Sequence, residues 1–313
     1  MSLDRVAGHP QYDYTGASKF IPQVWTKKLQ KKFYPKTSLT YISNNDFEGE
    51  IKSFGDEVII RGIPEISTAA YQKGAETDVQ YPESTATTLK INKGRACIIG
   101  CDDVDKVQSD LPLLNQWTEA AAKQNAIDIE TDFLANIYSD AHASNYGATA
   151  GAITGKFNLG ASGAPIQLTK TNVIDYLVDC GTVLGENNVS DEDCWMLVPE
   201  WVAGLIQKSD LKDCSMTGDS KSIIRTNVLG KYGRFNILKS NLLPYVAAAT
   251  ESSGFQSFYI MFGHKFATTF ANQFIKTEQA RPSKMFATFV KSLNVYGYKV
   301  VNPQGLGYMY ARQ

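Results

Sequence analysis

The chain has 313 residues, enough to bury one large core or two smaller ones. Its 31 basic and 32 acidic side chains nearly balance, which excludes a polycation that coats nucleic acid along its whole length. No apolar run approaches the roughly 18 residues of a membrane span, and the first 16 residues lack the apolar core of a secretory signal. Five irregularly spaced cysteines indicate reduced thiols packed as small hydrophobic side chains: Cys97, Cys101, Cys180, Cys194 and Cys214. We therefore expect synthesis in the cytoplasm and no membrane contact.

The first 40 residues are basic, with seven Lys and Arg side chains against two aspartates. Apolar residues recur between the lysines at three- and four-residue steps, which predicts a short amphipathic helix from about Pro22 to Tyr34. A basic helix of this kind can face phosphate, a membrane surface or an acidic protein segment. It can equally be a solvated helix whose apolar stripe packs on a neighbouring subunit or domain.

An acidic stretch follows, NNDFEGEIKSFGDEVIIRGIP at residues 44–64. Gly49 and Gly55 let the chain turn out of the basic arm, while Glu48 and Glu50 are expected to stay solvated or to meet basic neighbours. Two strands are predicted next, Asp56–Ile63 and Thr88–Ile99. The 24 residues between them, Pro64–Thr87, are rich in Thr, Ser, Ala and Glu and have almost no large apolar side chains. They are too many for a tight hairpin, and a connection of that length usually has a task or is disordered.

The clearest helix is predicted from Leu111 to Asp140, with an apolar stripe that includes Trp117, Ile127 and Phe133. Thirty residues in a helix span roughly 45 Å, which suits a spine along an elongated domain. A Gly-rich stretch, residues 145–163, reads as a loop or hinge.

The rest of the chain alternates helices with strands. A helix capped by Thr169 or Thr171, the buried strand CWMLV and a helix opened by Pro199 come first. Strands then dominate up to the end, with the strongest signal over Met285–Arg312. Because these strands read as antiparallel or mixed, we expect an α+β fold and not a doubly wound parallel sheet.

No group of residues forms a recognisable catalytic or metal site. The three histidines (His9, His142 and His264) lie apart, and no nucleophile elbow, zinc-protease or phosphate-loop motif is present. Cys97 and Cys101 lack a second pair at zinc-finger spacing, and the aspartates after them lack the glycine and glutamate of a calcium loop. We therefore predict no enzyme activity, no metal and no cofactor.

The order of segments resembles the major capsid proteins of tailed bacteriophages, whose fold is named after phage HK97. The resemblance covers essentially the whole chain. The stretches that carry it are FIPQVWTKKLQKKFYPKTSLT, NNDFEGEIKSFGDEVIIRGIP, TTLKINKGRACIIGCDDVDKVQSD, ENNVSDEDCWMLVPEWVAGLIQKS and GRFNILKSNLLP.

The resemblance implies a division into four parts. Residues 1–46 would be an N-terminal arm, and residues 47–100 an extended β-hairpin loop (the E-loop) that lies over an adjacent subunit. Residues 101–165 and 275–313 would form the peripheral domain with the long spine helix, and residues 166–274 the axial domain.

The implied function is mechanical. Copies of the chain would assemble as pentamers and hexamers into an icosahedral shell that encloses double-stranded DNA, which it contacts non-specifically. A portal protein, a separate scaffolding protein and a decoration or cement protein are expected partners, and the virion capsid is the expected location after assembly in the host bacterial cytoplasm. The alternatives are an encapsulin-like compartment of the same fold and, more distantly, a soluble α+β enzyme.

The residues expected at contacts between subunits come from the arm, the acidic stretch and the loop. They are Trp25, Lys27, Lys28, Lys31, Lys32, Glu48, Glu50, Arg61 and Lys73. Some proteins of this family join subunits by a Lys–Asn isopeptide bond beside a buried carboxylate. In this chain Lys73 is the candidate lysine, with Asn294 or Asn302 as its partner.

Overall fold

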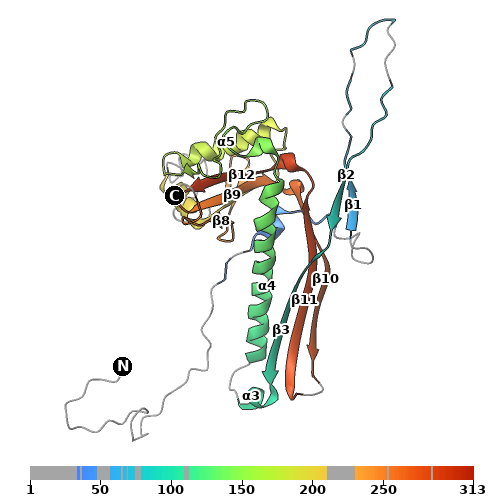
Figure 1. The fold of residues 1–313 in the computed structure, drawn as a ribbon, viewed down its shortest axis with the longest axis vertical. Coiled ribbons are helices and arrows are strands. Elements are labelled where there is room, and N and C mark those ends of the chain that lie inside the picture. The colour runs from blue at the N-terminus through green and yellow to red at the C-terminus, as the bar shows by residue number, and fades with distance from the viewer. Residues whose placement is uncertain are drawn as a thin grey trace, which may run out of the picture.

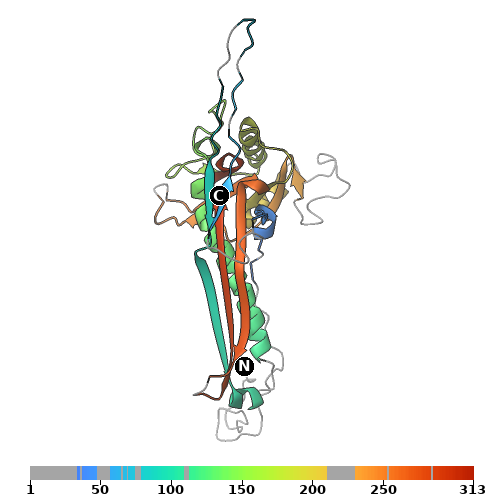
Figure 2. The same ribbon diagram turned by 90° about the vertical axis from the view of Figure 1, so that its right-hand side faces the viewer.

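The computed structural model describes residues 34–35, 37–47, 57–64, 66–68, 70–74, 79–108, 113–209, 230–251, 254–282 and 285–313. Within these ranges the chain forms two larger sheets, a small two-stranded sheet and several helices (Figures 1 and 2). Helices and strands are mixed along the chain, as the α+β prediction expects.

The first larger sheet is long and three-stranded. It contains β10 (Thr268–Ala280), β11 (Ala287–Val300) and β3 (Lys93–Asp102), all antiparallel, in the order β10-β11-β3. The short helix α3 (Asp103–Gln108) follows β3, and the long helix α4 (Leu113–Ile137) runs back along the sheet (Figure 1). The predicted spine helix is confirmed, with a 3-10 turn, η1 (Tyr138–Asp140), at its end.

Among the described residues, the fully buried side chains of α4 all lie in its second half. Ile129, Phe133 and Ile137 are buried, and they pack with side chains of both larger sheets, including Trp195 and Tyr296. This shared cluster joins the two sheets. Trp117 was predicted on the buried stripe, but it is 40% exposed, because the first half of the helix extends beyond this cluster.

The second larger sheet has seven strands. Its order is β4 (Ile166–Gln167), β12 (Leu306–Arg312), β9 (Ser257–His264), β5 (Cys194–Val198), β7 (Phe235–Lys239) and β6 (Lys231–Tyr232), with β8 (Tyr245–Val246) paired to β9. The pairs β5–β7 and β4–β12 are parallel and the others antiparallel, so the sheet is mixed. Every residue of β5 is buried, as its unbroken apolar run predicts.

Two helices cover this sheet, α5 (Val173–Glu186) and α6 (Glu200–Lys208). Both lay apolar residues on the strands, for example Leu177 and Ile206, and together they form the largest core cluster. Pro199 stands directly before α6, as predicted. The cap of α5 was predicted wrongly: Asn172 holds that position, while the hydroxyls of Thr169 and Thr171 bond to each other at 2.9 Å.

Two features of the chain differ from the layout expected from the sequence. The last strand, β12, was grouped with the peripheral strands, but it hydrogen-bonds to β9 in the seven-stranded sheet. Residues 145–163 form the predicted loop, but they are tied to the body of the protein: the Tyr310 N–H donates to the Leu159 carbonyl at 2.8 Å, and the Asn145 amide donates to the carbonyls of Gln304 and Leu306. A hinge in this loop stays a prediction, as do the domain boundaries.

Gly297 of β11 is needed where this strand crosses the base of the extended loop. A Cβ at this position would overlap the Lys90 carbonyl oxygen and approach the Cα of Ile91 at 2.9 Å. We expect Gly297→Ala to lower the free energy of unfolding by about 1–3 kcal/mol, measured by denaturant titration, because backbone atoms cannot move aside as a side chain can. Gly94→Ala on β3 is the control, since its Cβ would meet nothing closer than the Asn294 carbonyl at 3.8 Å. Equal losses for the two variants would contradict this explanation.

Candidate functional site

The extended loop is built on a two-stranded sheet. Strands β1 (Glu57–Arg61) and β2 (Ala86–Lys90) pair antiparallel, which confirms the predicted pairing for this part of the loop. The predicted strand Thr88–Ile99 is divided, however: from Lys93 on it belongs to β3, which pairs with β11. Beyond β1 and β2 the Gly62 N–H donates to the Thr85 carbonyl at 2.7 Å. Farther out, the Gln80 side chain bridges the two sides of the extended loop. Its carbonyl accepts from the Ser67 N–H, and its amide donates to the Ser67 carbonyl and hydroxyl. A side chain thus holds the arms together where the backbone ladder has ended, and the loop projects away from the body (Figure 1).

The described part of the loop exposes large apolar side chains. Ile63 is 93% exposed and Tyr81 is 86% exposed, and Ile66, Tyr71 and Val79 are also largely open to solvent. Exposed apolar surface of this kind is typical of interaction sites. Two predicted contact residues lie here: Arg61 at the end of β1 and Lys73 beside the turn at Gly74, both exposed.

The other predicted contact residues lie outside the described residues. They are Trp25, Lys27, Lys28, Lys31, Lys32, Glu48 and Glu50. Their roles stay predictions.

The segment that leads out of the arm is fixed to the spine helix by a buried carboxylate. Residues 37–44, here called the arm root, include the short helix α1 (Leu39–Ile42). Glu130 of α4 has no exposed surface and accepts three hydrogen bonds from the start of this helix: from the Ser38 N–H at 2.7 Å, the Ser38 hydroxyl at 2.8 Å and the Leu39 N–H at 3.3 Å. It thereby acts as a helix N-cap supplied by another element.

The arm root is also bonded to the long sheet. The Asn44 N–H donates to the Thr268 carbonyl, and the Phe270 N–H donates to the Asn44 carbonyl, both at 3.0 Å. Ile42 is fully buried between these bonds. Glu130 and β10 together therefore fix the place at which the arm leaves the body.

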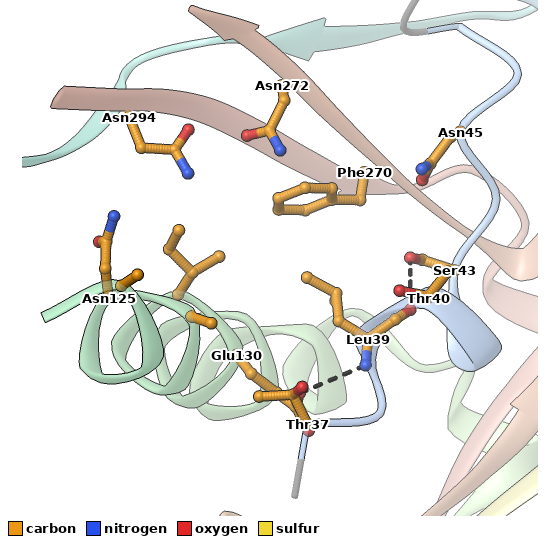
Figure 3. Close-up of a pocket in the computed structure, with 13 residues that line it drawn as sticks. Thr37, Leu39, Thr40, Ser43, Asn45, Asn125, Glu130, Phe270, Asn272 and Asn294 are labelled. Carbon is orange, nitrogen blue, oxygen red and sulfur yellow. Dashed lines mark hydrogen bonds between the residues drawn. The ribbon is translucent and has the colours of Figure 1, made fainter. Parts of the chain in front are cut away.

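A cavity of about 300 Å³ lies between the arm root, α4 and the long sheet (Figure 3). Its lining is mostly hydroxyl and amide groups, from Thr37, Thr40, Ser43, Asn45, Asn125, Asn272 and Asn294. The side-chain oxygens of Asn272 and Asn294 are buried and have no hydrogen-bond partner among the described residues. Glu130 and apolar side chains, among them Leu39, Ile129 and Phe270, complete the lining. Ordered water in a cavity of this size would satisfy the two unpartnered amide oxygens.

The base of the loop is held by a charged cluster. Asp132 of α4 accepts from the Lys93 ammonium at 2.9 Å and from the hydroxyls of Tyr296 and Tyr298, each at 3.1 Å. Burial acts to raise the pKa of Asp132, but Lys93 and the two tyrosines outweigh it and hold the pKa below its usual range. The cluster joins α4, β3 and β11 at one point.

The sequence analysis did not predict the roles of Glu130 and Asp132. The sequence does indicate a buried position for Glu130, because this residue falls within the apolar stripe between Ala126, Phe133 and Ile137. An acidic residue in such a stripe needs a buried partner. No comparable signal exists for Asp132, because its partners lie 39 and more residues away.

The histidines and cysteines of the described residues have structural roles. His142 and His264 each accept a hydrogen bond from a backbone N–H two residues later, at the starts of η2 (Ala143–Asn145) and η4 (Lys265–Ala267). Cys101, Cys180 and Cys194 are buried free thiols. Among the described residues no cluster of His, Cys, Asp and Glu could hold a metal ion, and no helix is long and apolar enough to cross a membrane.

The proposed isopeptide partners of Lys73 have other neighbours in this chain. Asn294 is buried against the cavity, and the Asn302 side chain accepts from the Gln304 N–H at 3.1 Å at the start of η5 (Pro303–Gly305). The cross-link stays a prediction.

No family model and no curated protein matches the chain. Solved structures do match over nearly its whole length. A structure from Mycobacterium phage Che8 is 23% identical with a TM-score of 0.73, and the alignment covers 92% of this chain and 96% of that one. The capsid of the cyanophage P-SCSP1u is 15% identical with a TM-score of 0.71 and 94% coverage of both chains. The mature capsid of bacteriophage PhiM1 is 14% identical with a TM-score of 0.63, covering 99% of this chain and 96% of that one.

The chain has the HK97-like fold of phage capsid proteins. Because the coverage is high in both directions, the capsid fold accounts for the whole described chain, from the extended loop to the last strand. The fold predicted from the order of segments is therefore confirmed, although the identities are too low to have indicated it by sequence comparison.

Proposed function

We propose that this protein is the major capsid protein of a tailed phage. Many copies, as pentamers and hexamers, close an icosahedral shell around double-stranded DNA. The observation that carries the proposal is the extended loop, which exposes Ile63, Tyr71 and Tyr81 on a chain with the capsid fold. A lone soluble protein gains nothing from such a surface, whereas a lattice buries it against a second copy.

The contacts proposed for the lattice follow the sequence prediction. Arg61 and Lys73 would meet a neighbouring copy through the loop, and Trp25, Lys27, Lys28, Lys31 and Lys32 through the arm, with Glu48 and Glu50 between them. A portal ring, a separate scaffolding protein, a decoration protein and the packaged DNA are the proposed partners, and the host cytoplasm the proposed place of synthesis.

An encapsulin-like compartment is the alternative within the same fold. The solved structures that match over nearly the whole chain include several phage capsids, which favours a genome-enclosing shell. A soluble enzyme has no support from the described residues: the carboxylates of Glu130 and Asp132 bind backbone N–H groups, a serine hydroxyl, a lysine and two tyrosines of the fold itself.

Electron microscopy of the purified protein, with and without a scaffolding protein, tests the proposal. We expect closed shells built of five- and six-membered rings, and nuclease-protected DNA inside particles taken from an infected host. Discrete small oligomers under every condition would overturn it. Shells that hold enzymes and no DNA would favour the compartment.

A further inference from the structure

The long sheet has one unprotected edge. Strand β3 pairs with β11 over ten residues without a shift in register, and no described strand pairs with its other side (Figure 2). Proteins usually block such an edge with a bulge, a proline or a central charge, because its free N–H and C=O groups can bind another strand. The stretch from Ala96 to Cys101 has none of these.

The opposite edge of the same sheet shows the protection that β3 lacks. Strand β10 has an irregularity between Asn272 and Phe274 and carries Lys276 and Glu278, which form an ion pair at 3.0 Å. The contrast indicates that the two edges meet different surroundings in the assembly.

The surface beside the free edge is apolar. Ile98 is 64% exposed and Leu293 is 40% exposed, and both lie on the face of the sheet turned away from the buried Cys101. Beyond Ile98 the Phe289 ring covers Gly100, and Lys291 is the residue opposite Ile98. A strand added to this edge would therefore gain apolar contacts as well as backbone hydrogen bonds.

The charges along β3 are arranged so that the strand complements itself. Arg95 and Lys93, which is bound to Asp132, stand at its start; Asp102 is its last residue and Asp103 the first residue of α3. If a second β3 runs antiparallel with Ile99 on the two-fold axis, Arg95 of each copy lies opposite Asp103 of the other, a carboxylate that also pairs with Arg281 of its own copy. An acidic or basic partner strand would match only one end.

The extended loop is a poorer occupant of this edge. Both of its arms contain a proline, Pro64 and Pro82, and a proline cannot donate to a ladder. The loop can cover an apolar face with its side chains, but it is not suited to a continuous ladder of ten residues.

We propose that β3 pairs with β3 of a second copy about a two-fold axis, so that two three-stranded sheets become one six-stranded sheet. The proposal adds a contact to the proposed shell: a two-fold contact uses the same surface on both copies, whereas the loop joins two different surfaces. Such a contact links subunits in pairs, in addition to the contacts within rings that the extended loop would make.

Site-specific photo-cross-linking tests the pairing. Benzoylphenylalanine placed at position 98 in shells assembled from a mixture of ¹⁴N- and ¹⁵N-labelled subunits is expected to give cross-links that join residues 93–103 of one copy to residues 93–103 of the other. Cross-links to any other peptide, cross-links only within one copy, or none at all would overturn the proposal. Electron microscopy shows independently whether shells form. If intact shells give no cross-link, the pairing is overturned and the proposed function stands. If no shells form, the proposed function is overturned alone, because the same cross-link can be sought in dimers.

A charge substitution gives a second, independent readout. Ile98→Lys places two lysines at diagonal positions across the pair and is expected to weaken association of two copies about tenfold or more, measured by sedimentation equilibrium. Leu293→Lys is the matched control on the same face one strand away, where the second β3 does not reach. Both variants must keep the wild-type circular dichroism spectrum and melting temperature. Equal association of the two variants would overturn the pairing.

Discussion

Glu130→Ala is expected to lower the free energy of unfolding by about 3 kcal/mol or more. Alanine removes the acceptor for two backbone N–H groups and one hydroxyl, at the buried Ser38 and the half-buried Leu39. The arm root then loses its attachment to α4. Denaturant unfolding of the wild type and the variant measures the difference.

Glu130→Gln is the matched control. Its carbonyl oxygen can accept from the Ser38 and Leu39 N–H groups, and its amide can donate to the Ser38 hydroxyl, so all three bonds are kept without the charge. We expect a loss below about 1 kcal/mol. If glutamine costs as much as alanine, the negative charge and not the hydrogen bonds holds the arm root.

The pH dependence of this pair follows from the direction of the pKa shift. Burial raises the pKa of Glu130, and the bonds from Ser38 and Leu39 oppose the rise without cancelling it. The folded chain thus holds this proton more tightly than the unfolded chain. Its contribution to stability is complete below the unfolded value of about 4.3 and is lost as the pH rises through the folded pKa. The stability of the wild type relative to Glu130→Gln should therefore fall as the pH rises from about 4, then level off. A difference that is constant with pH would contradict the shift.

Asp132→Ala is expected to have the next largest effect, a loss of about 2–4 kcal/mol in the free energy of unfolding. The substitution leaves the Lys93 ammonium and the hydroxyls of Tyr296 and Tyr298 without their common acceptor at the junction of α4 with the sheet. Asp128→Ala, one turn earlier, is the control. Its carboxylate accepts one exposed bond from Gln124, so we expect a loss below about 0.5 kcal/mol.

The sign of the pH effect at Asp132 is opposite to that at Glu130. The pKa of Asp132 is lowered, so its contribution to stability is present above the unfolded value of about 3.9 and is lost as the pH falls through the folded pKa. The difference between the wild type and Asp132→Ala should shrink below about pH 4. A difference that grows in acid would show that the cluster is not stabilised by the carboxylate charge.

Much of the fold could be predicted from local pattern. The 3.6-residue repeat predicted α4, and the unbroken apolar run predicted the buried strand β5. The length of the connection between β1 and β2 excluded a tight hairpin, while the extended loop itself was implied by the family resemblance. These features depend on which face of a segment is apolar and on the number of residues in a connection. Neither depends on residues that are distant in the sequence.

The candidate site was harder to predict. Its predicted residues were chosen for charge and for position along the chain, and of the nine only Arg61 and Lys73 lie among the described residues. The exposure of Ile63, Tyr71 and Tyr81 follows from the projection of the loop, which keeps them away from both cores. Composition alone describes this segment as polar.

The amino-acid sequence by itself determined the α+β class, the long helix, the loop and the absence of a recognisable catalytic motif, because each of these follows from local periodicity or from residue types. Only the tertiary structure decided that β12 joins the seven-stranded sheet, that Glu130 caps the arm root and that no described strand pairs with the outer edge of β3. The partners of β12 and of Glu130 are far from them in the sequence, and β3 has no described partner on its outer side. Pairing across such separations depends on how the whole chain packs, and no local pattern records it.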